Sequence, residues 1–193
     1  MNLPNKLTLL RVVLVPIFVI IMMIGIAYPL SNIIAAGVFL LTALTDMLDG
    51  KIARKYNMVT DFGKFMDPLA DKFLVFSALL GILVNPEFEY LRSVFVWAAA
   101  IIIFRELAVT SIRLVAAGSS GLVIAASWLG KIKTTLQMTC IVTIFLEPVV
   151  LPFHVFRDLH VLSYVTIAAM TVMTLWSGID YLTKYWKFLD PEK

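Results

Sequence analysis

Five of the 13 acidic residues in this chain of 193 residues fall between positions 46 and 71. Asp46 and Asp49 are three residues apart, so within a helix they share one face. Asp67 and Asp71 are four apart and share a face in the same way. Two antiparallel helices would then aim four carboxylates into one space, where they repel one another unless cations intervene. Because carboxylate oxygens select Mg²⁺ or Mn²⁺ over zinc or copper, the spacing predicts a site for two such ions.

A site with two metal ions suits an in-line displacement at phosphorus, because it stabilises both the attacking and the leaving oxygen. Gly50 and Gly63 leave bare backbone that a phosphate or nucleotide can approach closely. Arg54 can pair with a phosphate through two parallel hydrogen bonds. We expect Asp61 to be a helix N-cap, and Pro68, between the second pair of carboxylates, to kink or start a helix.

The composition indicates that these residues lie in a membrane protein. The chain is 61% hydrophobic and 15% charged, whereas a soluble domain is about half apolar and about a quarter charged. We predict an all-α integral membrane protein, a bundle of six transmembrane helices in a single domain over residues 1–193. Turn signals such as Asn85–Pro86 and Glu147–Pro148 separate the helices. The predicted ranges are 8–28, 31–56, 62–84, 91–116, 124–147 and 160–186.

The basic residues orient the predicted helices. All of the 16 lysines and arginines except Arg92 and Arg157 fall on one side, at the two termini or around the second-to-third and fourth-to-fifth connections. Cytoplasmic segments carry the excess of lysine and arginine. We therefore expect a multi-pass protein of the cell membrane with both termini and the active site cytoplasmic.

The second and third predicted helices are unusual. Their apolar stretches, Ile33–Leu44 and Phe73–Val84, hold 12 residues each. At about 1.5 Å per residue they cover roughly 18 Å of a hydrocarbon core about 30 Å thick. The carboxylates beside them must lie near the cytoplasmic interface, and ionisable groups at that depth mark function.

The carboxylate pattern resembles the signature of the CDP-alcohol phosphotransferase family, D-x2-D-G-x2-A-R-x8-G-x3-D-x3-D. Every fixed position of that signature is matched here, by Asp46, Asp49, Gly50, Ala53, Arg54, Gly63, Asp67 and Asp71.

The resemblance implies roles for these residues. Asp46, Asp49 and Asp67 would bind two Mg²⁺ or Mn²⁺ ions, and Asp71 would act as general base and also contact metal. The CDP-diacylglycerol site would be formed by Asp49, Gly50, Ala53, Arg54 and Gly63. The resemblance also implies a six-helix membrane bundle that is homodimeric, with its active site at the cytoplasmic interface.

Other residues resemble the bacterial branch of that family whose acceptor is glycerol 3-phosphate. They are Asn5, Leu7, Thr8, Arg11, Pro16, Arg105, Glu106, Arg113, Ser127, Gly130, Lys131, Lys133, Thr134 and Gln137. An acceptor with its own phosphate needs cations beyond the metal ions. We therefore predict an acceptor-phosphate site among Thr8, Arg105, Arg113, Lys131 and Lys133. Lys131 and Lys133 are two residues apart, so they should point in different directions and at most one should meet the substrate.

Two alternatives remain open. The acceptor could differ, as in a phosphatidylinositol-phosphate or phosphatidylserine synthase, because the signature does not choose the alcohol. The chain could instead be a divalent-metal transporter, since intramembrane carboxylates also mark ion pathways. A transporter predicts polar residues in both halves of the membrane, whereas this acidic cluster lies on one side. The expected partners are CDP-diacylglycerol, glycerol 3-phosphate and membrane lipids, with no nucleic acid.

The charge distribution makes a prediction about topology. Single cysteines introduced as Asn2→Cys and Glu192→Cys should both be labelled from the cytoplasmic side by a membrane-impermeant reagent. Labelling of the two positions from opposite sides would refute the six-helix arrangement.

Overall fold

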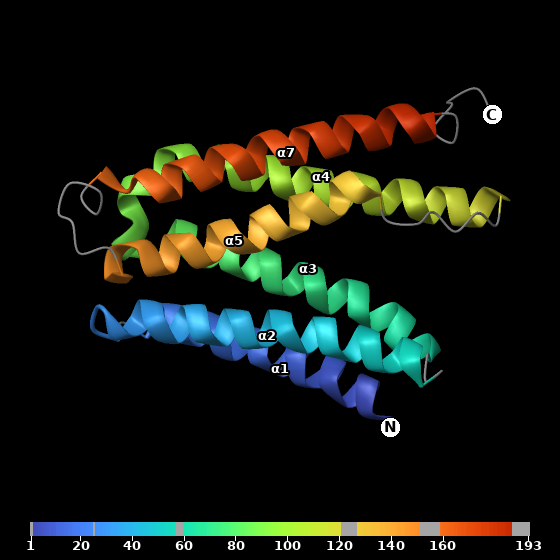
Figure 1. Ribbon diagram of the computed structural model, residues 1–193, viewed down its shortest axis with the longest axis horizontal. Coiled ribbons are helices and arrows are strands. Elements are labelled where there is room, and N and C mark those ends of the chain that lie inside the picture. The colour runs from blue at the N-terminus through green and yellow to red at the C-terminus, as the bar shows by residue number, and fades with distance from the viewer. Residues whose placement is uncertain (1, 25, 57–59, 121–126, 151–158, 187–193) are drawn as a thin grey trace.

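The computed structural model describes residues 2–24, 26–56, 60–120, 127–150 and 159–186, and these residues contain helices and no strand. Figure 1 shows the helices side by side in one bundle. The elements are α1 (Leu3–Met23), α2 (Leu30–Lys55), α3 (Asp61–Val84), the 3₁₀ helix η1 (Pro86–Leu91), α4 (Arg92–Ser120), α5 (Trp128–Val150) and α7 (Val161–Tyr185). The six long helices of the described residues confirm the predicted all-α bundle.

The helices alternate in direction. The start of α1, the end of α2, the start of α3 and the end of α7 all lie at one end of the bundle (Figure 1). Helix α1 packs against α2 and α3, while α5 packs against α2 and α7, and α4 against α3 and α7. The ends of α2 and α3 that carry the aspartates therefore lie at the same end as both chain termini.

Two helices are capped by polar residues that the sequence analysis did not identify as caps. Helix α1 starts at Leu3 because the Asn2 side chain caps it, accepting a hydrogen bond of 3.2 Å from the backbone N of Asn5. The predicted range of 8–28 is thus too late at both ends. Helix α3 is capped by Thr60, whose Oγ1 accepts a 3.1 Å bond from the backbone N of Gly63. The prediction that Asp61 is the cap is wrong, because the residue before it takes that position.

Two of the prolines that lie inside helices were expected to mark helix boundaries or a kink. Helix α3 continues on both sides of Pro68, so this residue does not start it. Helix α5 includes Pro148, and the predicted break at Glu147 is wrong. The Glu147 carboxylate, 3% exposed, accepts backbone bonds of 2.8 Å from Leu162 and 2.7 Å from Ser163. It thereby caps the first turn of α7 and ties the end of α5 to it.

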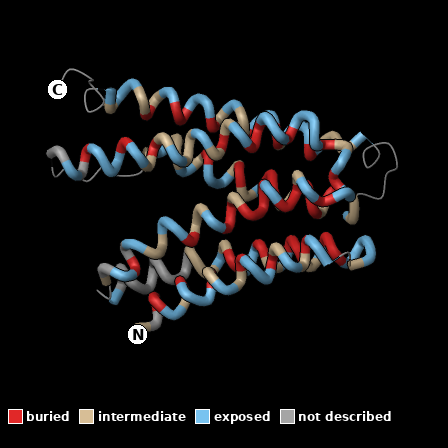
Figure 2. Tube along the Cα trace, turned by 180° about the vertical axis from the view of Figure 1, so that it is seen from behind, coloured by how far each residue is buried: buried red, intermediate tan, exposed pale blue. Residues whose placement is uncertain are grey.

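The main hydrophobic core lies away from the termini. Phe18 stands 6.0 Å from Phe39 and 6.1 Å from Phe145 between ring centroids, and Phe145 stands 5.6 Å from Phe88. These rings join α1, α2, α5 and η1. Figure 2 shows many of the buried segments gathered in the half of the bundle opposite the two termini. The larger apolar cluster therefore fastens one half of the bundle, and a smaller one of Val109, Ile112 and Tyr181 joins α4 to the end of α7.

Among the described residues, four stretches are long and apolar enough to cross a membrane: Pro4–Met23, Pro86–Ala116, Trp128–Val150 and Val161–Tyr185. Helix α2 offers only the shorter apolar stretch Leu30–Asp46. That stretch ends at the first aspartate of the pattern, as expected for carboxylates close to the edge of the hydrocarbon.

The Glu147 cap makes a prediction about stability. Glu147→Gln should lower the free energy of unfolding by about 1.5–3 kcal/mol, because the two backbone N–H groups at the start of α7 lose a charged hydrogen-bond acceptor. For a chain of this size that shift corresponds to a melting temperature lower by about 3–12 °C. The control is Glu89→Gln, whose side chain is 72% exposed. Equal melting temperatures for the two variants in detergent would contradict the capping role.

Candidate active site

The first contact of the site joins α1 to the end of α2. Arg11 Nη1 lies 2.6 Å from Asp46 Oδ1. The arginine side chain is 0% exposed and the aspartate side chain is 41% exposed. A buried guanidinium must be paired, because leaving it without a counter-charge is costly. Arg11 therefore holds Asp46 in one position while the carboxylate keeps an open side.

The second contact joins the same face of α1 to α3. Thr8 Oγ1 donates a 2.7 Å hydrogen bond to Asp67 Oδ1. Thr60 Oγ1, which caps α3, donates a 2.9 Å bond to Asn5 Oδ1. Asn5, Thr8 and Arg11 follow one another at intervals of three, so they form one polar stripe along α1. This stripe orients the carboxylates of two different helices.

Gly63 on α3 lies beside the Asn5 side chain of this stripe. A Cβ atom on it would stand 3.3 Å from both Asn5 Oδ1 and Thr60 Oγ1, and 3.8 Å from Asp67 Oδ2. A side chain here would push apart the two groups that hydrogen-bond to each other. The absence of a side chain at Gly63 therefore also serves the packing of α1 on α3.

Asp46 and Asp71 open onto the same cavity of about 500 Å³ between α2, α3 and α5. Its walls are mainly apolar, and α5 adds hydroxyl groups along the length of its wall, from Thr134 to Thr143. The lining includes Leu40, Ala43, Thr134, Thr135, Met138, Thr139, Val142 and Thr143. The cavity thus places two carboxylates beside a mainly apolar space, which matches a lipid with a charged head.

The predicted metal ligands are only partly within the described residues. The backbone of α2 includes Asp49, Gly50, Ala53 and Arg54, but their side chains lie outside the description. Among the side chains that are described, no group of three or more His, Cys, Asp or Glu residues is close enough to hold a metal ion. The described carboxylates are hard oxygen donors, a set that fits Mg²⁺ or Mn²⁺.

Asp71 also borders a second, smaller pocket that is polar. This pocket lies between α3, α4 and α5, and its lining includes Lys72, Glu106, Lys133, Thr134 and Gln137. Glu106 forms ion pairs with Lys133 and, at 3.0 Å, with Arg105 Nη1. The sequence suggests no role for Glu106, although an acid inside an apolar helix is itself a signal.

The four basic residues predicted for the acceptor phosphate do not gather in one place. Lys133 is buried beside Asp71, whereas Lys131 is exposed, which confirms that the two point in different directions. Arg113 Nε donates a 3.1 Å bond to the hydroxyl of Tyr181 on α7. Lys133 is therefore the one of these four that lines the pocket of Asp71.

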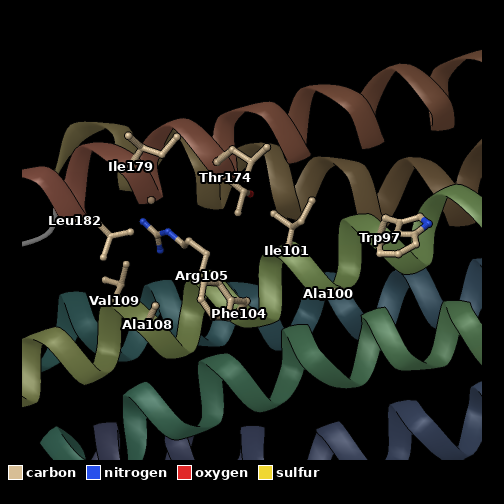
Figure 3. Close-up of a pocket in the computed structure, with 12 residues that line it drawn as sticks. Trp97, Ala100, Ile101, Phe104, Arg105, Ala108, Val109, Thr174, Ile179 and Leu182 are labelled. Atoms are coloured by element: carbon tan, nitrogen blue, oxygen red, sulfur yellow. The ribbon is translucent and has the colours of Figure 1, made fainter.

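Arg105 takes a different course. Figure 3 shows its side chain reaching from α4 toward α7, beside Ile179 and Leu182. It borders an apolar groove of about 470 Å³ between these helices. Gly178 makes room for it, because a Cβ there would stand 3.1 Å from Arg105 Cγ. Arg105 thus approaches the polar pocket through its ion pair with Glu106.

Comparisons with known proteins agree with this arrangement. Residues 1–178 match the CDP-alcohol phosphatidyltransferase family. A CDP-diacylglycerol–glycerol-3-phosphate 3-phosphatidyltransferase of Bacillus subtilis (strain 168) is 42% identical, covering 97% of each chain. The Escherichia coli (strain K12) protein of that name is 37% identical over 94% of this chain and 93% of its own. A probable phosphatidylglycerophosphate synthase of Mycobacterium tuberculosis (strain ATCC 25618 / H37Rv) is 38% identical over 95% of this chain and 81% of its own.

The buried charge pair makes a prediction that a double-mutant cycle can test. In the presence of a chelator, Arg11→Met and Asp46→Asn should couple by roughly 0.5–3 kcal/mol in the free energy of unfolding, because the residues are in direct contact. The double variant should lose less than the sum of the single losses. The matched control is the exposed pair Glu89 and Arg92, 3.1 Å apart, whose coupling should stay below about 0.5 kcal/mol. Equal coupling in the two cycles would contradict a structural role for Arg11.

Proposed function

The chain belongs to the CDP-alcohol phosphatidyltransferase family, and we propose that it transfers the phosphatidyl group of CDP-diacylglycerol to sn-glycerol 3-phosphate. The products are phosphatidylglycerol phosphate and CMP. Nearly full-length relatives carry the name of this activity. The observation that carries the proposal is that Asp46 and Asp71 line one mainly apolar cavity in a chain of this family.

The proposed step is a displacement at phosphorus. The primary hydroxyl of the acceptor attacks the β-phosphorus, which bears the diacylglycerol. The bond from this phosphorus to the oxygen bridging to the α-phosphorus breaks, and CMP leaves with that oxygen. The hydroxyl proton passes to Asp71, which must lie within hydrogen-bond reach of the acceptor. The position of Asp71 between the two cavities supports this assignment.

Enzymes of this family generally depend on a divalent metal. In our proposal Asp46, Asp49, Asp67 and Asp71 hold two Mg²⁺ or Mn²⁺ ions. When bound, such ions stabilise charge on the attacking and leaving oxygens. Arg11 and Thr8 would serve this site by orienting the carboxylates of Asp46 and Asp67.

The two substrates would occupy the two sides of Asp71. We assign the acceptor phosphate to the side of Asp71 that faces Lys133, which is linked to Arg105 through Glu106. Arg113 and Lys131 receive less support, because one bonds Tyr181 and the other is exposed. The nucleotide would lie along the α2 side, at Asp49, Gly50, Ala53, Arg54 and Gly63.

We further propose that the protein is a single domain that lies in the cell membrane, with both termini and the active site on the cytoplasmic side. We also propose that it forms a homodimer. The charge asymmetry of the sequence supports this orientation. The two chain ends lie at the same end of the bundle as the parts of α2 and α3 that carry the aspartates, which agrees with this orientation (Figure 1). A divalent-metal transporter is not supported, because the family and the named relatives are transferases and synthases.

The proposed activity predicts a product. Purified protein given Mg²⁺, CDP-diacylglycerol and one acceptor at a time should form phosphatidylglycerol phosphate and CMP with glycerol 3-phosphate. Chelation of the metal should abolish the reaction. Turnover with serine or inositol phosphate in place of glycerol 3-phosphate would reassign the acceptor, and no CMP release with any alcohol would refute the proposal.

The same assay tests whether Asp71 is the general base. Asp71→Asn keeps the shape of the side chain and removes the proton acceptor, so kcat should fall by about 10²–10⁴-fold while CDP-diacylglycerol still binds with Mg²⁺ present. Asp46→Asn should instead weaken metal and nucleotide binding together. If excess Mg²⁺ restored the activity of Asp71→Asn, the residue would be a metal ligand and not the base.

A further inference from the structure

One buried side chain near Asp71 has a polar group without a protein partner. Gln137 on α5 is 1% exposed. Its Nε2 has no hydrogen-bond partner among the described residues. Buried polar atoms of native proteins are nearly always paired, and a buried water is the usual partner where the protein offers none.

The pocket that Gln137 lines has the size of one water molecule. Its volume is about 20 Å³, and a water needs roughly 10–15 Å³ of such space. The cations of this pocket already have partners: Lys72 Nζ donates to Thr110 Oγ1 at 2.5 Å, and Lys133 is paired with Glu106. Gln137 is thus the buried side chain of this pocket whose donor no described protein atom satisfies.

Asp71 is the carboxylate of the candidate site that α1 does not hold. Arg11 on α1 lies 2.6 Å from Asp46. Thr8 on the same helix donates to Asp67 at 2.7 Å. Burial and the charges of its neighbours act on Asp71, but among the described residues no side chain donates a hydrogen bond to it. A base needs a third group to orient it, so the orienting group of Asp71 has to come from elsewhere.

A water in this pocket has suitable partners on both sides. Gln137 lies three residues after Thr134, so both share one face of α5, and Asp71 lies across the pocket on α3. The water would accept a hydrogen bond from Gln137 Nε2 and donate its two hydrogens to the Asp71 carboxylate and to Thr134 Oγ1. The Thr134 hydroxyl can accept, because its own hydrogen goes to the backbone carbonyl of Gly130 at 3.0 Å. Three hydrogen bonds are typical of a buried water, on the order of 2–4 each.

We infer that Gln137 holds one water in this pocket and that this water donates a hydrogen bond to Asp71, so that Gln137 orients the carboxylate. The inference rests on the proposed function. Gln137 is a positioning residue, which touches neither substrate and carries no proton in the reaction. With one carboxylate oxygen of Asp71 turned to the water, the other is left to accept the proton of the attacking hydroxyl.

The test is a double-mutant cycle in kcat. Gln137→Met keeps the length of the side chain and removes its polar group, so kcat should fall by about 5- to 150-fold. KM for both substrates should stay within about twofold of the wild-type values, because neither substrate touches Gln137. In the Asp71→Asn protein, which has already lost the base, the same substitution should change kcat by less than about twofold. A defect of folding or packing would instead lower kcat in both backgrounds.

The control is Ser177→Ala on α7, a buried residue that lines neither pocket of Asp71. Its effect on kcat should be the same in both backgrounds. A crystal structure of the wild type should also show a water within about 3.2 Å of both Gln137 Nε2 and a carboxylate oxygen of Asp71. The Gln137→Met structure should lack that water.

Three results would overturn the inference and leave the proposed function standing. They are an unchanged kcat in Gln137→Met, an equal loss of kcat in both backgrounds, and a wild-type pocket in which no water joins Gln137 to Asp71. If the wild type released no CMP with glycerol 3-phosphate, the proposed function would fail and the inference with it.

Discussion

The arrangement of this site depends on a polar stripe along a helix that is otherwise apolar. Arg11 and Thr8, three residues apart on α1, contact carboxylates on α2 and α3 respectively. An unpaired guanidinium inside the bundle would be strongly unfavourable, so α2 must keep Asp46 beside Arg11. Because one face of one helix satisfies both contacts, the two carboxylates are fixed relative to each other before any ligand binds.

The remainder of the bundle is organised around this requirement. The tilted and edge-on ring contacts of Phe18, Phe39 and Phe145 fasten the helices in the half away from the aspartates. The cap that Glu147 forms on α7 closes that same end. Packing is therefore densest where no chemistry is expected, and the two cavities that Asp71 borders lie at the other end. Such a division lets a rigid scaffold hold a site that must admit substrates.

The sequence predicted the six helices and the meeting of α2 with α3, because apolar length, basic charge and carboxylate spacing are all local properties. It also indicated that Lys131 and Lys133 diverge. It did not predict that Arg11 pairs with Asp46, because spacing tells which face a residue occupies and not which helix it meets. The path of Arg105 toward α7 depends on Gly178, 73 positions away, and is likewise tertiary. The roles of Asp49 and Arg54 remain predictions, since their side chains are not described.

Asp71 stands on the wall shared by two cavities of different character. One is large and mostly apolar, and the other is small and charged. In the proposed reaction, a reagent dissolved in lipid and a reagent dissolved in water would meet at this wall, and neither would have to enter the phase of the other. The bundle then serves as an interface between solvents, with a single carboxylate at the boundary.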